Sequence, residues 1–199
     1  MAELSMPPSP ELQSKFMEFM VEHNRPQMAG FKRWIFQPGM LFHASGKWWG
    51  DRGTRPALHE GLDLYSFEDA GGRVKTVDQH IQIPAPFAGH IVKIDRDFLG
   101  KSIYLSHAIF AAGGRQLLSA FGHTIPRDFL KTGQQVAEGE IIAAISGFPG
   151  KKTNLLPHVH LTFAWAPVDF RAGQLTWKNL GHDPGITLID PLTVISSFL

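Results

Sequence analysis

From Leu58 onward the chain is divided into short runs of alternating apolar and polar residues, and turn residues separate the runs. A period of two places successive side chains on opposite faces of a strand, so the runs predict strands rather than helices. The runs are LHEGLDLYSF (58–67), HIVKIDRDF (90–98), KSIYLSHAIF (101–110), RQLLSAFGHT (115–124), EIIAAIS (140–146) and HVHLTFAWA (158–166). The AGG sequences at 70–72 and 112–114 are expected to be turns. The pattern predicts a mainly β, antiparallel sandwich or barrel-like domain.

Two stretches of this region are weakly similar to each other. PAPFAGHIVKI (84–94) and KTGQQVAEGEIIAAIS (131–146) both join a turn to an apolar strand. We interpret them as two related hairpin pieces, a repetition typical of compact β sandwiches and barrels.

In the N-terminal part, the apolar residues recur with the spacing of a helix rather than that of a strand. Residues 1–8 are expected to be a loose leader, and 9–24 to be a helix capped by Ser9 with Pro10 in its first turn. Its apolar stripe consists of Leu12, Phe16, Phe19 and Met20. We therefore divide the chain into a leader and helix over 1–29 and a β-rich domain over 30–199.

Both ends of the β-rich domain have distinct patterns. Residues 26–56 lack a period but are rich in aromatic side chains, which predicts an ordered segment wrapped around the body. A short helix is expected to begin at Asp190 and Pro191.

Composition excludes several classes of function. The 199 residues suit one domain, and a net charge of +1 with scattered basic residues gives no footprint for nucleic acid or an anionic membrane. No apolar run of about 18 residues is present, and the first residues lack the layout of a secretory signal. The chain has no cysteine, so any metal would be held by His, Asp or Glu. We expect a monomer.

The candidate chemistry lies in HEGLD (59–63) and HVH (158–160). On strands, His59 and Asp63 would share one face, with Gly61 leaving room between them, and His158 and His160 would share another. Two imidazoles and one carboxylate can hold Zn²⁺ and leave a position for water, whose pKa the metal lowers. The remaining imidazole could then move a proton or stabilise an oxyanion.

Other readings apply to single histidines. A lone histidine on a strand is usually a surface or core residue, and we assign that role to His23, His43, His80, His90 and His182. The helical His-Glu-x-x-His signature is absent, which excludes a helical zinc protease. His123, at the end of a predicted strand, is the candidate for a second unligated imidazole that assists catalysis beside the proposed metal.

In these residues the chain resembles the lysostaphin-type, or LytM-type, zinc endopeptidases that cleave peptide bonds in bacterial cell-wall peptidoglycan. The resemblance covers about 105 residues and rests on HEGLD, APFAGHIVKI (85–94), AFGH (120–123) and HVH, with IDPLTVI near the end. It implies that His59, Asp63 and His160 are zinc ligands and that His123 and His158 are an unligated catalytic pair. It also implies peptidoglycan stem or cross-bridge peptides as substrates and a location in the cell envelope, either periplasmic or secreted.

The chain departs from the family pattern at two places. Phe121 stands where the family often has a tyrosine, and Thr162 stands where it often has a glutamate. His107 lies where the family often has a histidine before the mid-chain strand, and we expect it either to be structural or to support the metal ligands from behind. Trp48, Trp49 and Tyr65 are expected to pack in the core or to line the groove.

Two alternative functions remain open at this stage. One is a non-catalytic relative of the family that binds zinc or a partner and regulates cell-wall hydrolysis. The other is a phosphocarrier or lipoyl-type carrier, because PAPFAGHIVKI resembles the opening of such folds. A lipoyl carrier displays its lysine at a turn, whereas Lys93 is predicted to lie within a strand.

Overall fold

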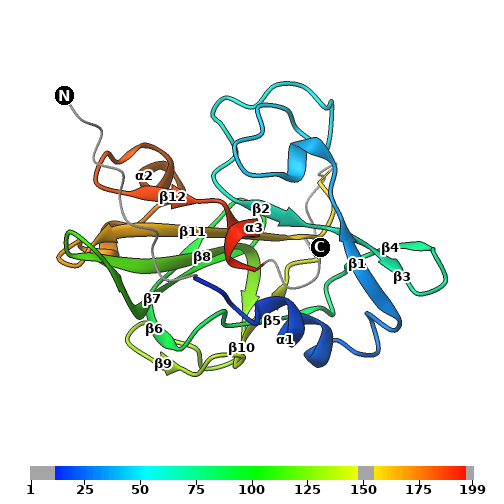
Figure 1. Cartoon of the computed structure of the whole chain (residues 1–199), viewed down its shortest axis with the longest axis horizontal. Helices are drawn as coiled ribbons and strands as arrows, with labels where there is room; N and C mark the ends of the chain where they lie inside the picture. The colour runs from blue at the N-terminus through cyan, green and yellow to red at the C-terminus, as the bar shows by residue number, and fades with distance from the viewer. Residues whose placement is uncertain (1–11, 148–154, 196–199) are drawn as a thin grey trace.

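The computed structural model describes residues 12–147 and 155–195, and most of their regular secondary structure consists of antiparallel strands (Figure 1). The elements are α1 (Phe16–His23), β1 (Phe31–Ile35), the 3-10 helix η1 (Pro38–Met40), β2 (Leu62–Leu64), β3 (Ser66–Asp69), β4 (Val74–Thr76), β5 (Gln82–Pro84), β6 (Gly89–Arg96), β7 (Lys101–Ala111), β8 (Arg115–Pro126), β9 (Gln135–Val136), β10 (Ile141–Ile145), β11 (Val159–Pro167), the 3-10 helix η2 (Ala172–Gln174), α2 (Trp177–His182), β12 (Thr187–Ile189) and α3 (Pro191–Val194). The predicted fold class, mainly antiparallel β with short helices near both ends, is confirmed.

The main sheet of the described residues runs in the order β12-β11-β8-β7-β6-β9, with β2 added to β11 and β10 to β8. Its long strands are the alternating runs of the sequence, and their buried positions include Ile103, Leu105, Phe121, Leu161 and Phe163. The predicted turns at 70–72 and 112–114 join β3 to β4 and β7 to β8, with positive φ at Gly72, Gly113 and Gly114. The sheet gives β2 and β11 a rigid support.

The two similar stretches do not form separate hairpins. Instead they pair with each other, β5 with β10 and β6 with β9. The prediction of two hairpin pieces was therefore wrong in its connectivity. Each stretch supplies an apolar strand, and the partner strand that covers its edge comes from the other stretch.

Helix α1 begins at Phe16, and residues 12–15 before it are not helical. Its first turn is stabilised by Ser14, whose Oγ accepts a hydrogen bond from the Phe16 N–H at 3.1 Å. The predicted cap at Ser9 and Pro10 lies outside the described residues, and the expected start of the helix was too early for residues 12–15. Phe16, Met17 and Met20 are buried in the main core, so the helix packs against the sheet.

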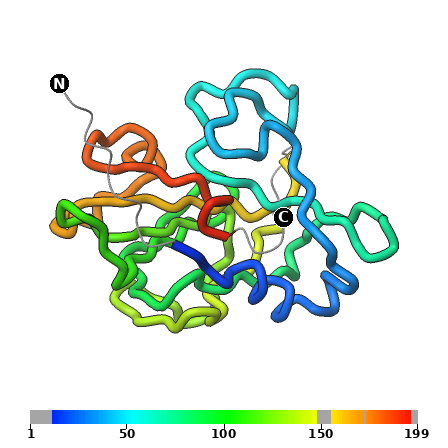
Figure 2. The backbone as a smooth tube through the Cα atoms, in the orientation of Figure 1, coloured from blue at the N-terminus to red at the C-terminus, as the bar shows by residue number. Residues whose placement is uncertain are grey.

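The segment between α1 and β2 is ordered, as predicted, and it has two parts. β1 joins β3 and β4 in a small separate sheet. The chain then doubles back in loops that lie beside β2, coloured blue to cyan at the top of Figure 2. Trp48 in these loops is buried, which places an aromatic side chain next to the start of β2.

The C-terminal part contains more structure than the sequence predicted. α3 begins as expected, with Asp190 accepting a hydrogen bond from the Leu192 N–H, but α2 and β12 were not predicted. Residues 196–199 of the predicted closing segment lie outside the described ranges. In the part of the chain that the structure describes, the helices are too short to cross a membrane.

Candidate metal centre

One strand register brings together residues that are distant in the sequence. β2 pairs with β11 so that Asp63 and His160 are direct partners, and His160 is also opposite Gly122 of β8. His59 precedes β2 and is not on a strand, so the expectation that it shares a strand face with Asp63 was wrong. Its backbone is fixed instead by hydrogen bonds with His43 and Ala44 of the preceding loop.

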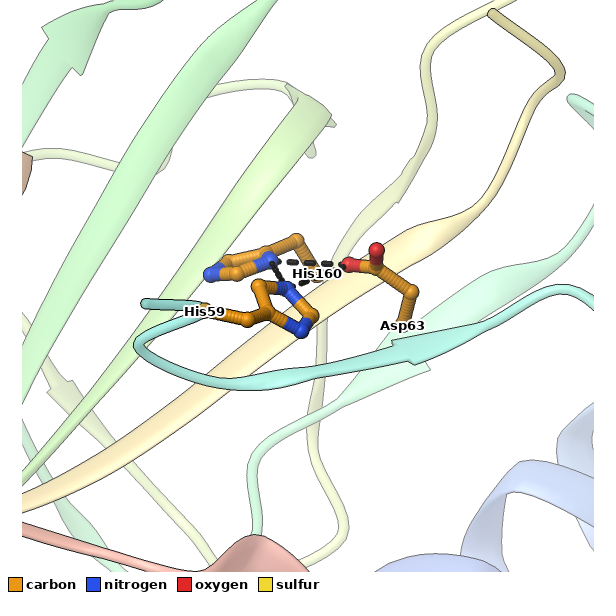
Figure 3. A group of neighbouring side chains, drawn as sticks. All are labelled: His59, Asp63 and His160. Atoms are coloured by element: carbon orange, nitrogen blue, oxygen red, sulfur yellow. Dashed lines mark hydrogen bonds and ion pairs between the residues drawn. The ribbon is translucent and has the colours of Figure 1, made fainter. Parts of the chain in front are cut away.

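The side chains of His59, Asp63 and His160 point toward one another (Figure 3). His160 Nδ1 lies 2.8 Å from Asp63 Oδ1 and 3.1 Å from His59 Nε2. His59 Nε2 lies 3.3 Å from Asp63 Oδ1. All three residues are buried. Four ligands around zinc at about 2.0–2.1 Å lie about 3.3 Å from one another, so these separations suit a shared ion.

In His59 and His160, the ring nitrogen that points away from the cluster is hydrogen-bonded to another group. His59 Nδ1–H donates to the Leu41 carbonyl oxygen at 2.9 Å, which leaves a lone pair on Nε2. His160 Nε2 lies 3.2 Å from Thr162 Oγ1, which can accept its hydrogen and leave the lone pair on Nδ1. Thr162 therefore orients the imidazole.

Asp63 is held on its other oxygen. Trp48 Nε1–H donates to Oδ2 at 2.7 Å, and the Arg55 guanidinium lies 3.4 Å from the same atom. Burial alone would raise the pKa of Asp63, but the neighbouring His158, His59 and His160 outweigh it and hold that pKa well below its usual range. Asp63 is therefore a carboxylate whose Oδ1 faces the two imidazoles.

These lone pairs fit a metal ion. His59 Nε2 and Asp63 Oδ1 are both acceptors, and at 3.3 Å they repel each other unless a proton or a cation lies nearby. Burial lowers the pKa of His160, which keeps the imidazole neutral and able to ligate. Within the described residues, these three form the group of side chains that could hold a metal ion. Two imidazoles and a carboxylate are a donor set that catalytic zinc uses.

Gly61 is required for the close approach of the turn before β2 to β11, as the sequence suggested. A Cβ atom at this position would collide with the Leu161 carbonyl oxygen, Thr162 Oγ1 and His160 Nε2. Glycine therefore allows the turn before β2 to lie directly against β11.

His158 is a fourth imidazole beside the cluster. Its Nδ1–H donates to the Leu156 carbonyl oxygen at 2.7 Å, so its Nε2 carries a lone pair and lies 3.6 Å from Asp63 Oδ1. Burial lowers the pKa of His158 to about 4, against the opposing effect of Asp63. The ring packs edge-on against Trp48 at 5.2 Å and against His123 at 4.8 Å.

His123 lies within β8 rather than at its end. The pairing of β7 with β8 shifts between Lys101 and Ile103, so two β8 residues, Gly122 and His123, stand opposite one β7 residue. His123 has φ 62°, which is uncommon for a residue other than glycine. This bulge turns His123 toward His158, whereas Phe121 on the same strand is buried against Phe16.

Asp97 holds the bulge in place. Its Oδ2 accepts a hydrogen bond from the His123 backbone N–H at 2.7 Å, and its Oδ1 accepts from the N–H groups of Leu99 and Gly100. His123 Nδ1 lies 3.4 Å from Oδ2 but is buried without a hydrogen bond among the described residues. Burial would raise the pKa of Asp97, yet the contacts with His123 and Leu99 hold it well below its usual range.

Sequence reasoning missed the supporting residues. Asp97 and Arg55 were not assigned to the site, and Thr162 was noted only as a departure from the family pattern. Trp48 was expected either to pack in the core or to line the groove, whereas it is buried and also bonds Asp63. One signal was present for Asp97, because Asp-x-x-Gly before a strand is typical of a turn in which the carboxylate caps backbone N–H groups.

The remaining histidines lie outside the cluster. His107 is fully buried between Ala88 O and Ser119 Oγ, as a structural residue would be, and burial lowers its pKa to about 4. His23 bonds the Gly139 carbonyl oxygen, and His90 is exposed beside Gln135.

A cavity of about 180 Å³ opens onto the cluster. Its lining residues are Trp49, Arg55, His59, Glu60, Asp63, Phe98, His123, Leu155, His158, His160 and Trp177. All five predicted site residues therefore border one space. Tyr65 does not line it and packs on Trp48 instead.

Comparison with known proteins gives structural similarities only. No protein-family model and no curated protein matches the chain. Among solved structures, the chain is similar to LytU, with 17% identity over 79% of this chain and 84% of that one and a TM-score of 0.41. It is also similar to the catalytic domain of the M23 protein EnpA from Enterococcus faecalis, with 17% identity, 66% and 85% coverage and a TM-score of 0.38.

Two further structures are longer than this chain. For lysostaphin the identity is 16%, the coverage is 82% of this chain and 54% of that one, and the TM-score is 0.44. For a zinc-containing peptidase from Vibrio cholerae the identity is 16%, the coverage is 67% and 36%, and the TM-score is 0.40. Similarity at this level says nothing of activity, and the chemistry of the site rests on the side chains described above.

Proposed function

We propose that this chain is a zinc-dependent endopeptidase that hydrolyses peptide bonds in bacterial cell-wall peptidoglycan, with water as the nucleophile. The observation that carries the proposal is the convergence of His59 Nε2, Asp63 Oδ1 and His160 Nδ1 in a buried group whose outward atoms are already bonded. Proteins of similar structure include lysostaphin and a zinc-containing peptidase. The substrate class and the cell-envelope location of the proposal come from the resemblance of the motifs HEGLD, AFGH and HVH to those of lysostaphin-type endopeptidases.

His59, Asp63 and His160 would hold the zinc. When bound, zinc supplies a Lewis acid that polarises the peptide carbonyl and makes water a better nucleophile at neutral pH. Leu41, Thr162 and Trp48 fix the orientation of the three ligands through their outward atoms.

His158 is suited to accept a proton. Its Nδ1–H is bonded to Leu156 O, so Nε2 is unprotonated and faces the cluster. With a pKa of about 4, His158 is neutral at pH 7 and available as a base for the attacking water.

His123 is suited to act on the other side of the reacting carbonyl. The carboxylate of Asp97 lies 3.4 Å from its Nδ1 and faces the ring. An N–H group of this imidazole can donate a hydrogen bond to the developing oxyanion and then a proton to the leaving amine. No covalent intermediate is required.

The experiment is digestion of purified muropeptides, read by mass spectrometry together with zinc analysis of each protein. We expect His160→Ala to lose both zinc and cleavage, and His158→Ala to keep zinc and lose cleavage. His90→Ala, at an exposed position on β6, is the matched control and keeps both. Undiminished cleavage by His160→Ala would refute the assignment.

The alternative function is a non-catalytic relative that binds zinc or a partner and regulates hydrolysis by others. It is favoured if the wild type binds zinc and cleaves no muropeptide.

A further inference from the structure

A second cavity of about 340 Å³ lies next to the one that opens onto the metal centre. It is lined by His43, Pro56, Ala57, Leu58, Glu60, Trp177, Gly181, His182 and Leu188. Glu60 and Trp177 line both cavities, so the two spaces are neighbours that meet at these side chains. Its walls come from the loop before β2 on one side and from α2 and β12 on the other.

Glu60 is the residue after His59, but the two side chains have different surroundings. The His59 imidazole is buried in the metal centre, whereas the Glu60 carboxylate is half-buried and borders both cavities. Among the described residues, this carboxylate has no hydrogen bond and no ion pair. A carboxylate that borders two cavities and has no partner is available to bind a cation.

No lysine or arginine lines the second cavity in the described part of the chain. Arg55 lines the first cavity, but its guanidinium is committed to Asp63 and to the carbonyl oxygens of Gly39 and Gly46. Among the described residues, neither wall therefore supplies a lysine or arginine that pairs with Glu60, and the histidines of the two walls form no ion pair with it.

Apart from Glu60, Gly181 and the two histidines His43 and His182, the second cavity is lined by apolar side chains. Leu58 is 54% exposed, and Pro56, Ala57, Leu188 and the Trp177 ring complete this surface. An aliphatic chain can pack along such a wall while its charged end reaches a carboxylate. The combination suits a long side chain with a terminal ammonium group better than a compact cation.

We infer that the second cavity is a substrate subsite in which Glu60 binds the ammonium group of a peptide side chain with an aliphatic stem. Glu60 directly follows a proposed zinc ligand, and adjacent Cα atoms are about 3.8 Å apart, so the recognised residue lies within about two residues of the scissile bond in an extended peptide. This inference rests on the proposed function, because it names the kind of peptide that the endopeptidase selects.

The test compares blocked peptides with a Gly-Gly core in which lysine, Nε-acetyl-lysine or norleucine stands on either side of the core. The kcat/KM of each peptide is measured for the wild type, Glu60→Gln, Glu60→Lys and the control Glu138→Gln, which changes an exposed glutamate in the turn before β10. Because Glu60 also acts electrostatically on His160, the informative quantity is the ratio between lysine and norleucine peptides for each protein.

We expect the wild type and Glu138→Gln to prefer lysine over norleucine about two- to fivefold, the range of a partly exposed ion pair. Glu60→Gln brings the ratio to about one, and Glu60→Lys reverses it. The inference is overturned if the wild type has no preference, or if Glu60→Gln keeps it.

A binding measurement separates this inference from the proposed function. The NMR signal of the Trp177 indole N–H is followed while the full chain is titrated with Nα-acetyl-lysine N-methylamide or its norleucine analogue. If no peptide is cleaved but the lysine compound alone shifts this signal in a Glu60-dependent manner, the subsite stands and the peptidase proposal fails. If neither compound shifts it, the subsite is refuted whether or not cleavage occurs.

Discussion

The indole Nε1–H of Trp48 donates a hydrogen bond to Asp63 Oδ2 over 2.7 Å. This contact joins the loops after β1 to the carboxylate of the proposed metal centre and leaves Asp63 Oδ1 facing His59 and His160. The aromatic segment that wraps the body thus has a chemical role as well as a packing role.

Replacing Trp48 by phenylalanine should weaken zinc binding without unfolding the protein. The ring that packs on Tyr65 and His158 is largely kept, but the hydrogen bond that orients Asp63 is lost. Loss of such an outer contact typically lowers metal affinity by about 10- to 100-fold. Competition with a chromophoric chelator measures the dissociation constant. Trp49→Phe is the control, and an equal loss of affinity in both variants would contradict the role of the Trp48 hydrogen bond.

Replacing Asp97 by asparagine should impair cleavage while leaving zinc bound. Asp97 bonds the backbone of the bulge that orients His123, and its charge faces His123 Nδ1. Misplacing a catalytic group by about 1 Å can cost about 100-fold, so we expect kcat to fall by about 10- to 100-fold with a smaller change in KM. Asp95→Asn, which changes a carboxylate of β6 that pairs with Lys93, is the control. Loss of zinc from Asp97→Asn would show that the effect is not confined to His123.

Replacing Gly61 by alanine should disrupt the centre itself. The added Cβ would displace β11 or the turn before β2, because the atoms that it meets include the backbone of Leu161. We expect loss of zinc and destabilisation by about 1–3 kcal/mol, the usual cost of overpacking. Zinc analysis and chemical denaturation measure the two effects. Gly46→Ala, where a Cβ meets nothing within 4 Å, should leave both unchanged; zinc retained in Gly61→Ala would show that the loops can adjust.

His107 should make the protein less stable as the pH falls. Its pKa in the folded chain is about 4, against 6.5 for an ordinary histidine, because burial disfavours the charged form. The unfolded chain therefore binds the proton first, and stability is full above about pH 6.5 and is lost as the pH falls toward about 4. A difference of this size corresponds to about 3 kcal/mol.

The measurement is the free energy of unfolding of wild type and His107→Gln between pH 7 and pH 4. Glutamine does not titrate, so the advantage of the wild type over the variant should shrink by about 3 kcal/mol across this interval. A difference that stays constant with pH would show that His107 does not titrate between these values.

The sequence predicted the strands well because alternation reports directly on which face is buried. The runs that contain Ile103, Phe121 and Phe163 became β7, β8 and β11 with small changes at their ends. The pairing of the two similar stretches could not be predicted, since alternation specifies the faces of a strand and not its neighbour. α2 and β12 were missed because each is too short for a period to be visible.

For the candidate site, the sequence identified the five side chains that border one cavity, but not what holds them. His59 was expected on a strand and lies in a turn that the loop at His43 and Ala44 stabilises. The bulge at His123 depends on a carboxylate from another strand connection, Asp97. Contacts of this kind join distant segments, so no local pattern reveals them.

The nested pairing of β5 with β10 around that of β6 with β9 has a consequence for how the chain folds. The inner ladder needs the chain through Val136 and the outer ladder needs it through Ala144, so both join residues that are distant in the sequence and this region is expected to assemble late. The same two ladders bridge the exposed connection at 127–134. A protease that nicks this connection would therefore leave both fragments clamped together by backbone hydrogen bonds.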